Sequence, residues 1–380
     1  MSPVLILTAG YGEGHNAAAR GLQAGFAAIG VEAKVLDLFA PAFGATYERS
    51  RQDYIRIVNK RPWLWALCYQ ILDRVPFLPL LLPLLKPLKR ELVAALTKWQ
   101  PDTVVSVYPV YGYLLNAAVR KAGLQMPRRL TVVTDSITVN SVWYRCGADA
   151  FLVPNEDTAD VMLAAGVRRE ELRVSGFPVS PNFAAPGPER PEPGSGVRPR
   201  VLFMVNGQPG RVVPLVERLL REGQVDLTVT AGKDVELKAS LEDLAQRLGR
   251  PLEVLGWVGD VPGLLRRNHL LIGKAGGAMV QEALAAHTPM IVTQILPGQE
   301  EGNARLLIQN GCGVHCPTNE AVVEILGQVF GGDCVGWRRM YGHTVKLSRP
   351  DAARETALWI QAQRSGGKFE ADGTFGVRTV

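Results

Sequence analysis

Short apolar runs alternate with longer amphipathic stretches along the first half of the chain. The apolar runs predict strands at residues 3–9, 31–38, 103–107, 129–134 and 150–153. The stretches between them predict helical structure at residues 14–29, 47–99, 110–122 and 156–165. Runs without polar alternation are typical of strands that are buried on both faces of a parallel sheet. This alternation predicts a doubly wound, Rossmann-like α/β domain over residues 1–180.

The same alternation restarts after a segment rich in proline and glycine, residues 181–199, which we interpret as a linker. Further strands are predicted at residues 200–205, 226–231, 252–255, 270–273, 290–293 and 313–315. They place a second Rossmann-like domain at residues 200–349. We expect a helix at residues 350–365 to pack back on the first domain, and residues 366–380 to form a polar tail. Ligands bind beyond the carboxyl ends of such strands, so two such domains predict a central cleft.

Composition narrows the class of protein. The chain has 380 residues, 47% of them hydrophobic, which is enough for two cores. Five scattered cysteines, and a first strand with no charged segment before it, predict a reducing, cytoplasmic setting. His315 lies between Cys312 and Cys316, but no second ligand pair accompanies them, so we expect no metal site. The net charge of +6, without basic residues interleaved with aromatic ones, favours an anionic membrane or substrate over nucleic acid.

One apolar segment, VPFLPLLLPLLKPL at residues 75–88, is too short to span a bilayer and is interrupted by four prolines. Basic residues flank it and tryptophans precede it, a combination that is typical of a surface lying in a lipid interface. A buried loop and helix pair that covers a core is the alternative interpretation. The predicted acceptor or membrane residues are Trp63, Trp65, Leu80, Leu81, Leu82, Leu84 and Leu85.

Two turns in the second half carry groups that suit a sugar nucleotide. In the first, Gly273-Lys274-Ala275-Gly276-Gly277, glycines expose backbone N–H groups at the start of a helix, where phosphate binds readily. Glu282 follows inside that helix. The second turn, residues 297–303, gathers amide and carboxylate side chains. Taken alone, the first turn could be an ordinary α/β turn. Together, phosphate donors and hydroxyl-binding groups predict a nucleotide-sugar pocket.

The loop that follows the first strand also contains three glycines. Gly10-Tyr11-Gly12-Glu13-Gly14-His15 is close to the dinucleotide fingerprint, and Asp37 ends the second strand where a ribose-binding acid would lie. A Rossmann dehydrogenase that binds NAD is therefore an alternative. However, His15 occupies the third glycine position, and the second glycine-rich unit stays unexplained.

His15 and Asp135 are the candidate catalytic residues. A histidine at a helix N-terminus favours its neutral form and can act as a general base. Asp135 lies at the end of a predicted strand, where it could orient His15 or bind a substrate hydroxyl. For both residues the alternative is a capping role without chemistry.

These residues together resemble the monogalactosyldiacylglycerol synthases and the processive diacylglycerol glucosyltransferases of glycosyltransferase family 28. The peptidoglycan N-acetylglucosaminyltransferase is a more distant relative. The similarity runs over most of the chain. The motifs that carry it are LILTAGYGEGH (5–15), VVTD (132–135) with Trp143 beyond, VSGFPVSPNF (174–183), LGWV (255–258), GKAGGAMVQEAL (273–284) and LPGQEEGNA (296–304).

The resemblance implies the two-domain GT-B fold, with the lipid acceptor and the membrane on residues 1–180 and a UDP-sugar on residues 200–349. By position, Gly276 and Gly277 would meet the diphosphate, and Glu282 the ribose hydroxyls. Gln299 and Glu300 would meet the hexose hydroxyls, Trp257 and Val258 would lie beside the uracil, and His15 would be the base. The other donor-binding residues are Gly14, Lys274, Ala278, Gly298 and Asn303.

The implied activity is that of an inverting hexosyltransferase in glycolipid synthesis. UDP-glucose or UDP-galactose would be the donor substrate, with no covalently bound cofactor, and diacylglycerol a suitable acceptor. The enzyme would be peripheral on the inner, cytoplasmic face of the cell membrane. A hydrolysing sugar-nucleotide epimerase and a non-catalytic UDP-sugar-binding protein of the same fold remain alternatives.

Three positions and one loop depart from the family pattern. Gly273 and Ala275 replace a threonine and a proline that the family often has. Asn140 stands where the family usually has a histidine after the Thr-Asp pair. The glycine-rich loop expected after the first strand of the second domain is reduced to residues 206–210.

Overall fold

The chain folds into two compact units. The structure, a computed structural model, describes residues 2–75, 78–187, 190–194, 196–205 and 209–364. One unit comprises the described residues up to 181 together with those from 351 onward, and the other comprises residues 182–350. Four sequence features fall wholly or partly on residues that are not described: the predicted polar tail, the loop residues Asn206 to Gln208, Pro188 in the predicted linker, and Pro76 and Phe77 in the apolar segment.

The first unit contains a six-stranded sheet in the order β2-β1-β3-β4-β5-β6, and every pairing is parallel. The strands are β1 (Val4–Thr8), β2 (Ala33–Asp37), β3 (Thr103–Ser106), β4 (Arg128–Val132), β5 (Ala150–Val153) and β6 (Leu172–Val174). Strands β1, β3 and β5 are buried at every position, as their uninterrupted apolar runs predict. The predicted doubly wound sheet is therefore confirmed in this unit.

Proline and glycine divide the long helical stretch at residues 47–99. It contains most of α3 (Ala45–Lys60), α4 (Pro62–Arg74), α5 (Leu78–Leu81), the 3-10 helix η1 (Leu82–Leu85) and α6 (Lys86–Trp99). Prolines stand in the first turns of α4, η1 and α6, where a missing N–H group costs nothing. Gly44 precedes α3 with a positive φ of 50°.

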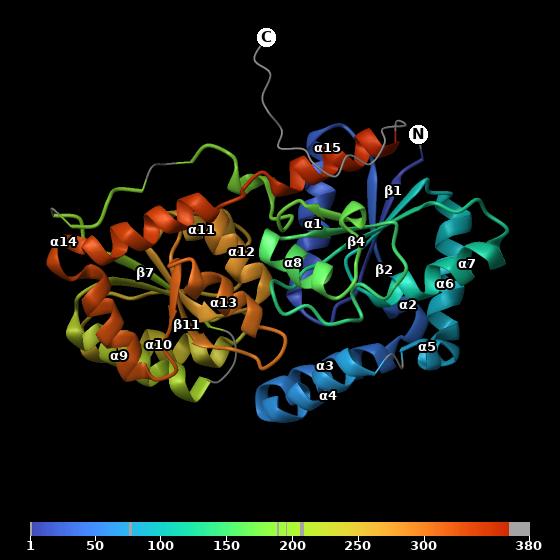
Figure 1. Cartoon of the computed structure of the whole chain (residues 1–380). Coiled ribbons are helices and arrows are strands. Elements are labelled where there is room, and N and C mark those ends of the chain that lie inside the picture. Colours follow the sequence, from blue (N-terminus) through green and yellow to red (C-terminus); the bar gives the residue numbers. More distant parts are fainter. Residues whose placement is uncertain (1, 76–77, 188–189, 195, 206–208, 365–380) are drawn as a thin grey trace, which may run out of the picture. The chain divides into compact units, whose positions relative to one another are not determined.

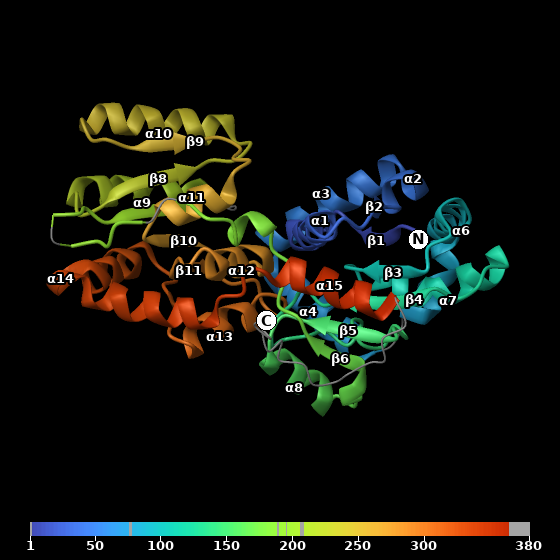
Figure 2. The ribbon, with the colours of Figure 1, turned by 90° about the horizontal axis from the view of Figure 1, so that it is seen from above.

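The other helices of this unit are α1 (Glu13–Ala28), α2 (Phe39–Phe43), α7 (Val110–Ala122), α8 (Glu156–Ala164), the 3-10 helix η2 (Arg169–Glu171) and α15 (Ala352–Arg364). Helix α15 packs against α1, and Figures 1 and 2 show the two helices next to each other. A Cβ atom on Gly25 would come within 2.3 Å of the Ala353 carbonyl oxygen, and one on Gly21 within 1.8 Å of the Pro178 carbonyl oxygen. Glycines on one face of α1 thus allow α15 and residue 178 to approach its backbone.

The second unit contains another six-stranded parallel sheet, in the order β12-β11-β10-β7-β8-β9. Its strands are β7 (Arg200–Met204), β8 (Asp226–Thr230), β9 (Glu253–Leu255), β10 (Leu270–Lys274), β11 (Met290–Gln294) and β12 (Gly313–His315). Its helices are the 3-10 helix η3 (Pro181–Phe183), α9 (Pro209–Glu222), α10 (Val235–Leu248), α11 (Val261–Arg267), α12 (Gly277–Ala285), α13 (Glu301–Gln309) and α14 (Asn319–Leu347). Each predicted strand of this half is present.

Arg190 anchors part of the segment that we interpret as a linker. Its guanidinium donates to the Asn268 carbonyl, to the Thr288 hydroxyl at 3.1 Å and to the His287 carbonyl at 2.7 Å. It also lies 5.9 Å from the centre of the Trp337 ring. The segment is therefore fastened to the second unit at this residue.

His269, at the start of β10, forms a second fixed point. Its Nδ1 accepts the Arg200 N–H at 2.8 Å, and its Nε2 lies 2.7 Å from the Pro191 carbonyl oxygen, to which it donates. Since Nδ1 is an acceptor here, protonation would break the bond to Arg200. The pKa of His269 is lowered to about 4, mainly by burial and also by the nearby Arg190 and Arg200, while the hydrogen bond to Pro191 opposes the shift.

We predict that the free energy of unfolding decreases as the pH is lowered, because this histidine then becomes protonated. The pKa in the folded chain is below the unfolded value of about 6.5, so the contribution is complete above pH 6.5 and is lost as the pH falls toward 4. For this residue the loss at pH 5 should be about 2 kcal/mol. Urea unfolding at pH 8 and pH 5 measures it. His269→Gln should weaken the pH dependence, and the exposed His315→Gln is the control. If the free energy of unfolding changes equally between pH 8 and pH 5 in wild type and in His269→Gln, the prediction is contradicted.

Candidate functional site

His15 lies in the first turn of α1, directly after the glycine-rich loop. Its Nδ1 is 3.2 Å from the Thr134 hydroxyl, and its ring meets the Tyr108 ring edge-on at 5.1 Å between centroids. Burial lowers the pKa of His15 to about 4, although a hydrogen bond to the Val107 carbonyl opposes the shift. The imidazole is therefore neutral at pH 7 and can accept a proton.

Asp135 follows β4 and is buried. Its carboxylate accepts a hydrogen bond of 2.8 Å from the indole N–H of Trp143. The Trp143 ring in turn lies 5.7 Å from the His15 ring, between centroids. The structure thus brings the two candidate catalytic residues together around one indole. From the sequence, Trp143 is named only as part of a motif. Nothing local distinguishes a tryptophan near a turn from an ordinary core residue.

Asn140 links the loop after β4 to α4. Its amide donates to the Tyr69 carbonyl at 3.0 Å, and its side-chain oxygen accepts the Val142 N–H at 3.2 Å. The side chain is buried. This residue, which departs from the family pattern, therefore acts here as a structural tie between two segments.

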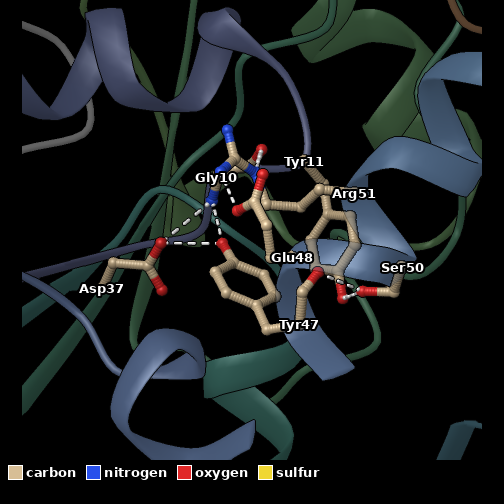
Figure 3. Close-up of polar contacts among 7 residues, drawn as sticks. All are labelled: Gly10, Tyr11, Asp37, Tyr47, Glu48, Ser50 and Arg51. Carbon is tan, nitrogen blue, oxygen red and sulfur yellow. Dashed lines mark hydrogen bonds and ion pairs between the residues drawn. The ribbon is translucent and has the colours of Figure 1, made fainter. Parts of the chain in front are cut away.

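Asp37, the ribose-binding acid of the dehydrogenase interpretation, is engaged by the protein itself. Its Oδ1 accepts the Phe39 N–H at 2.9 Å, and its Oδ2 accepts the Tyr47 hydroxyl at 2.7 Å and the Gly10 N–H at 3.2 Å. Figure 3 shows the carboxylate turned toward Gly10 and Tyr47. Asp37 holds the glycine-rich loop in place, so the geometry gives no support to a dinucleotide site here.

The glycine-rich turn of the second unit connects β10 to α12, which begins at Gly277. The first N–H groups of a helix have no acceptor within it, and the helix dipole favours an anion there. A Cβ on Gly276 would meet Lys274 Cε at 3.3 Å, so the glycine allows the lysine to lie across the turn. Ala278 follows in the same helical turn. Backbone donors and one ammonium group are thus presented at the carboxyl end of β10, as phosphate binding requires.

The two turns of the second unit contact each other. Lys274 Nζ is 3.2 Å from Glu300 Oε1, and Glu300 Oε2 accepts the Leu296 N–H at 3.0 Å. The Asn303 amide donates to the Ala275 carbonyl at 3.1 Å. Glu300 and Asn303 are buried. Both side chains, predicted to bind donor, therefore also fix the second turn against the first.

A pocket opens at the carboxyl ends of β7, β10 and β11. Lys274 and Arg211 supply positive charge to its wall, and Gln294, Thr293 and Asn319 supply polar groups. Positive charge next to the α12 N-terminus suits a diphosphate. The remaining donor candidates lie on the same unit, except Gly14 in α1. Trp257, beyond β9, is exposed and carries Lys233 Nζ 5.2 Å from its ring centre. Val258, Glu282, Gly298 and Gln299 are partly buried.

The predicted acceptor or membrane residues divide into two sets. Trp63, Leu80, Leu81 and Leu84 are exposed, with 78% of Leu80 and 72% of Leu84 accessible. Leu82 and Leu85 instead pack against the core of the first unit, and the Trp65 ring lies 5.0 Å from Tyr54. The exposed set is extended by apolar side chains of the neighbouring turns, namely Ile55, Leu67, Ile71 and Val75. An apolar surface therefore covers α4, α5 and η1.

Comparison with known proteins gives two family matches in chain order. Residues 15–179 match the model of monogalactosyldiacylglycerol (MGDG) synthase, and residues 210–330 match the glycosyltransferase family 28 C-terminal domain. A probable chloroplastic monogalactosyldiacylglycerol synthase of Glycine max is 27% identical over 368 residues, covering 92% of this chain and 69% of the relative. The processive diacylglycerol beta-glucosyltransferase of Bacillus subtilis (strain 168) is 26% identical over 328 residues, covering 84% and 85%.

Among solved structures, MurG of Acinetobacter baumannii superposes with a TM-score of 0.60 at 15% identity, covering 94% of this chain and 99% of MurG. At that identity the likeness concerns the fold alone. Each unit of this chain thus has its own family match, and the first match begins at His15 and includes Asp135, while the second includes Gly276 and Glu282.

Proposed function

We propose that this chain belongs to the family of monogalactosyldiacylglycerol synthases and processive diacylglycerol glucosyltransferases, with the GT-B fold, and that it transfers a hexose from a UDP-sugar to diacylglycerol. The observation that carries the proposal is the pair of family matches, each lying on a unit that holds part of the candidate site. The first contains a buried, neutral histidine whose neighbour Trp143 is hydrogen-bonded to Asp135, and the second a glycine-rich turn at a helix N-terminus.

The proposed reaction exchanges one carbon–oxygen bond for another and transfers one proton. The acceptor hydroxyl attacks the anomeric carbon, the bond from that carbon to the diphosphate oxygen breaks, and the hydroxyl proton passes to His15. Negative charge grows on the departing diphosphate. The N–H groups at the start of α12 and Lys274 would stabilise that charge. In-line displacement inverts the configuration at the sugar.

Product analysis tests this proposal. Purified protein is incubated with diacylglycerol vesicles and either UDP-glucose or UDP-galactose, and the lipids are separated. We expect a glycosylated lipid from one donor, which would identify the hexose. Free sugar without glycolipid would favour the hydrolysing epimerase. UDP-sugar binding without turnover would favour a non-catalytic binding protein. Binding of NAD instead would favour the dehydrogenase.

We also propose that the apolar surface over α4, α5 and η1 seats the enzyme on an anionic membrane. Arg61, Arg74, Lys86, Lys89 and Arg90 flank or interrupt its residues in the sequence. Apolar side chains with a basic rim bind a lipid interface by burying area and by attracting anionic headgroups. Within the described ranges, none of the helices combines the length and apolar character that crossing a bilayer requires. Peripheral attachment is therefore the mode that we propose.

Replacing Leu80 and Leu84 with glutamate should abolish this attachment. Burial of a leucine stabilises by about 1.5–3 kcal/mol, so losing two should weaken partitioning by roughly a hundredfold or more. Flotation with vesicles containing anionic lipid measures it. The control is Val235→Glu in α10, where an equally exposed apolar side chain (77% accessible) lies on the second unit. Equal flotation of the double variant and the control would contradict the membrane surface.

A further inference from the structure

Two neighbouring helices contact both loops that carry the candidate catalytic residues. Helices α3 and α4, residues 45–74, form a hairpin whose helices lie side by side (Figure 1). The Trp65 ring in α4 meets the Tyr54 ring in α3 edge to face. The Tyr54 ring lies 6.3 Å, between centroids, from the Tyr11 ring in the glycine-rich loop. The same hairpin carries exposed apolar side chains, including Trp63 and Leu67. The surface proposed to meet the membrane is thus directly connected to these loops.

The first connection fixes the peptide groups of Gly10. Arg51 Nε donates to the Gly10 carbonyl at 2.7 Å, and the Tyr47 hydroxyl accepts the Gly10 N–H at 2.5 Å while donating to Asp37. Ser50 Oγ lies 2.8 Å from the Tyr11 hydroxyl. Figure 3 shows Arg51 and Tyr47 reaching Gly10 and Ser50 reaching the Tyr11 hydroxyl, all from α3. Both hydrogen-bonding groups of this residue are therefore held by α3.

The loop needs such support because glycine occupies residues 10, 12 and 14. Glycine adopts many backbone conformations with little difference in energy, and Gly12 has a φ of 132°, which other residues rarely adopt. A loop of this kind does not set the position of His15 by itself. Contacts from outside the loop must select one conformation.

The second connection runs from α4 to the loop that carries Asp135 and Trp143. Asp73 Oδ1 accepts the Ser141 N–H at 2.7 Å, and the Asp73 carbonyl accepts the Ser141 hydroxyl at 2.6 Å. The Tyr69 hydroxyl donates to the Thr138 carbonyl at 3.2 Å. With the Asn140 bond to Tyr69, these contacts join the last turns of α4 to the segment beside Asp135.

We propose that the α3–α4 hairpin is a positioning element for the transfer reaction, with Arg51 and Tyr47 as positioning residues that set His15 through Gly10. The inference rests on the proposed function. Neither residue touches the reacting atoms: each holds the loop from which α1 and His15 begin. A displaced base lowers the rate of the chemical step and leaves donor binding unchanged, because the donor candidates other than Gly14 lie on the second unit.

Arg51 allows a sharp test because glutamine and methionine, two neutral replacements, differ in whether they carry an N–H donor. Glutamine places its amide nitrogen the same number of bonds from Cα as arginine Nε, so Arg51→Gln can keep the bond to the Gly10 carbonyl. Arg51→Met has a similar length and no donor. Both variants lose the ion pair with Glu48. The matched control is Arg56→Met on the same helix, where an exposed arginine pairs with Asp53.

With diacylglycerol vesicles, Arg51→Met should lower kcat by about tenfold to a hundredfold, the range expected from misplacing a catalytic group by about 1 Å. Arg51→Gln should recover most of the loss, and Arg56→Met should match wild type. The donor KM, UDP affinity and flotation should stay unchanged in all three. Tyr47→Phe, which keeps the buried ring and removes the hydroxyl, should also lower kcat at constant donor KM.

Several outcomes would overturn the inference. Equal kcat for Arg51→Met and Arg51→Gln would show that the hydrogen bond to the Gly10 carbonyl does not matter for the rate. An equal loss of kcat in Arg56→Met would show the same. A kcat loss that tracks the melting temperature across the variants would show that stability alone is affected. If wild type forms no glycolipid from either donor, the proposed function fails. If wild type is active and the variants match it, the positioning role fails.

Discussion

Replacing His15 with alanine is expected to lower kcat by about 10²–10⁴-fold, the contribution typical of a general base. The imidazole is buried beside Thr134 and Trp143, and its lowered pKa keeps it neutral at the pH of most assays. A neutral histidine near the acceptor hydroxyl can take its proton as the glycosidic bond forms. Binding of UDP should be unchanged, because the diphosphate groups are assigned to the second unit.

The pH dependence of kcat tests the same role without a variant. Since the pKa of His15 is about 4, the base stays in its active form as the pH falls from 8 to 5. We expect kcat to stay level over that range and to fall only as the pH approaches 4. Asn16→Ala, next in the chain, is the control variant for changes at the start of α1. Near-normal turnover of His15→Ala would remove His15 from the base role and leave Asp135 as the candidate.

The sheets and most helices could be predicted because their signals are local. Strands buried on both faces give continuous apolar runs, and glycine or proline marks many of the turns between them. Strand β6 could not be predicted. It has three residues, and only Leu172 is fully buried, so its sequence carries little pattern. Its pairing with β5 comes from the fold around it.

In the candidate site too, some residues have a local sequence signal and others do not. His15, Asp135 and Gly276 could be singled out because glycine-rich loops and strand ends are recognisable in sequence. The role of Asp37 could not be, because two of the residues that bind it, Tyr47 on α3 and Phe39, follow it in the chain without any motif. Likewise, the contact of Glu300 with Lys274 joins turns that are separated by a whole helix and strand. Such pairings depend on how elements pack.

Replacing Glu282 with alanine is expected to raise the donor KM by about tenfold to a hundredfold, the loss typical of a hydrogen bond to a charged group. Glu282 lies in α12, the helix whose N-terminus is proposed to hold the diphosphate. A ribose joined to that diphosphate must lie near the same helix. The family resemblance assigns its hydroxyls to this carboxylate.

The design of this experiment depends on separating binding from catalysis. Glu282 is assigned to the ribose hydroxyls and not to the reacting hydroxyl, so kcat at saturating donor should change far less than KM. Glu242→Ala, which removes the same charge from an exposed position on α10 of the same unit, is the control. Glu282→Gln keeps an acceptor and should lose less affinity than alanine does. If the donor KM of Glu282→Ala equals that of Glu242→Ala, the ribose contact belongs to another residue. The helix would then contribute to donor binding only through its N-terminal N–H groups.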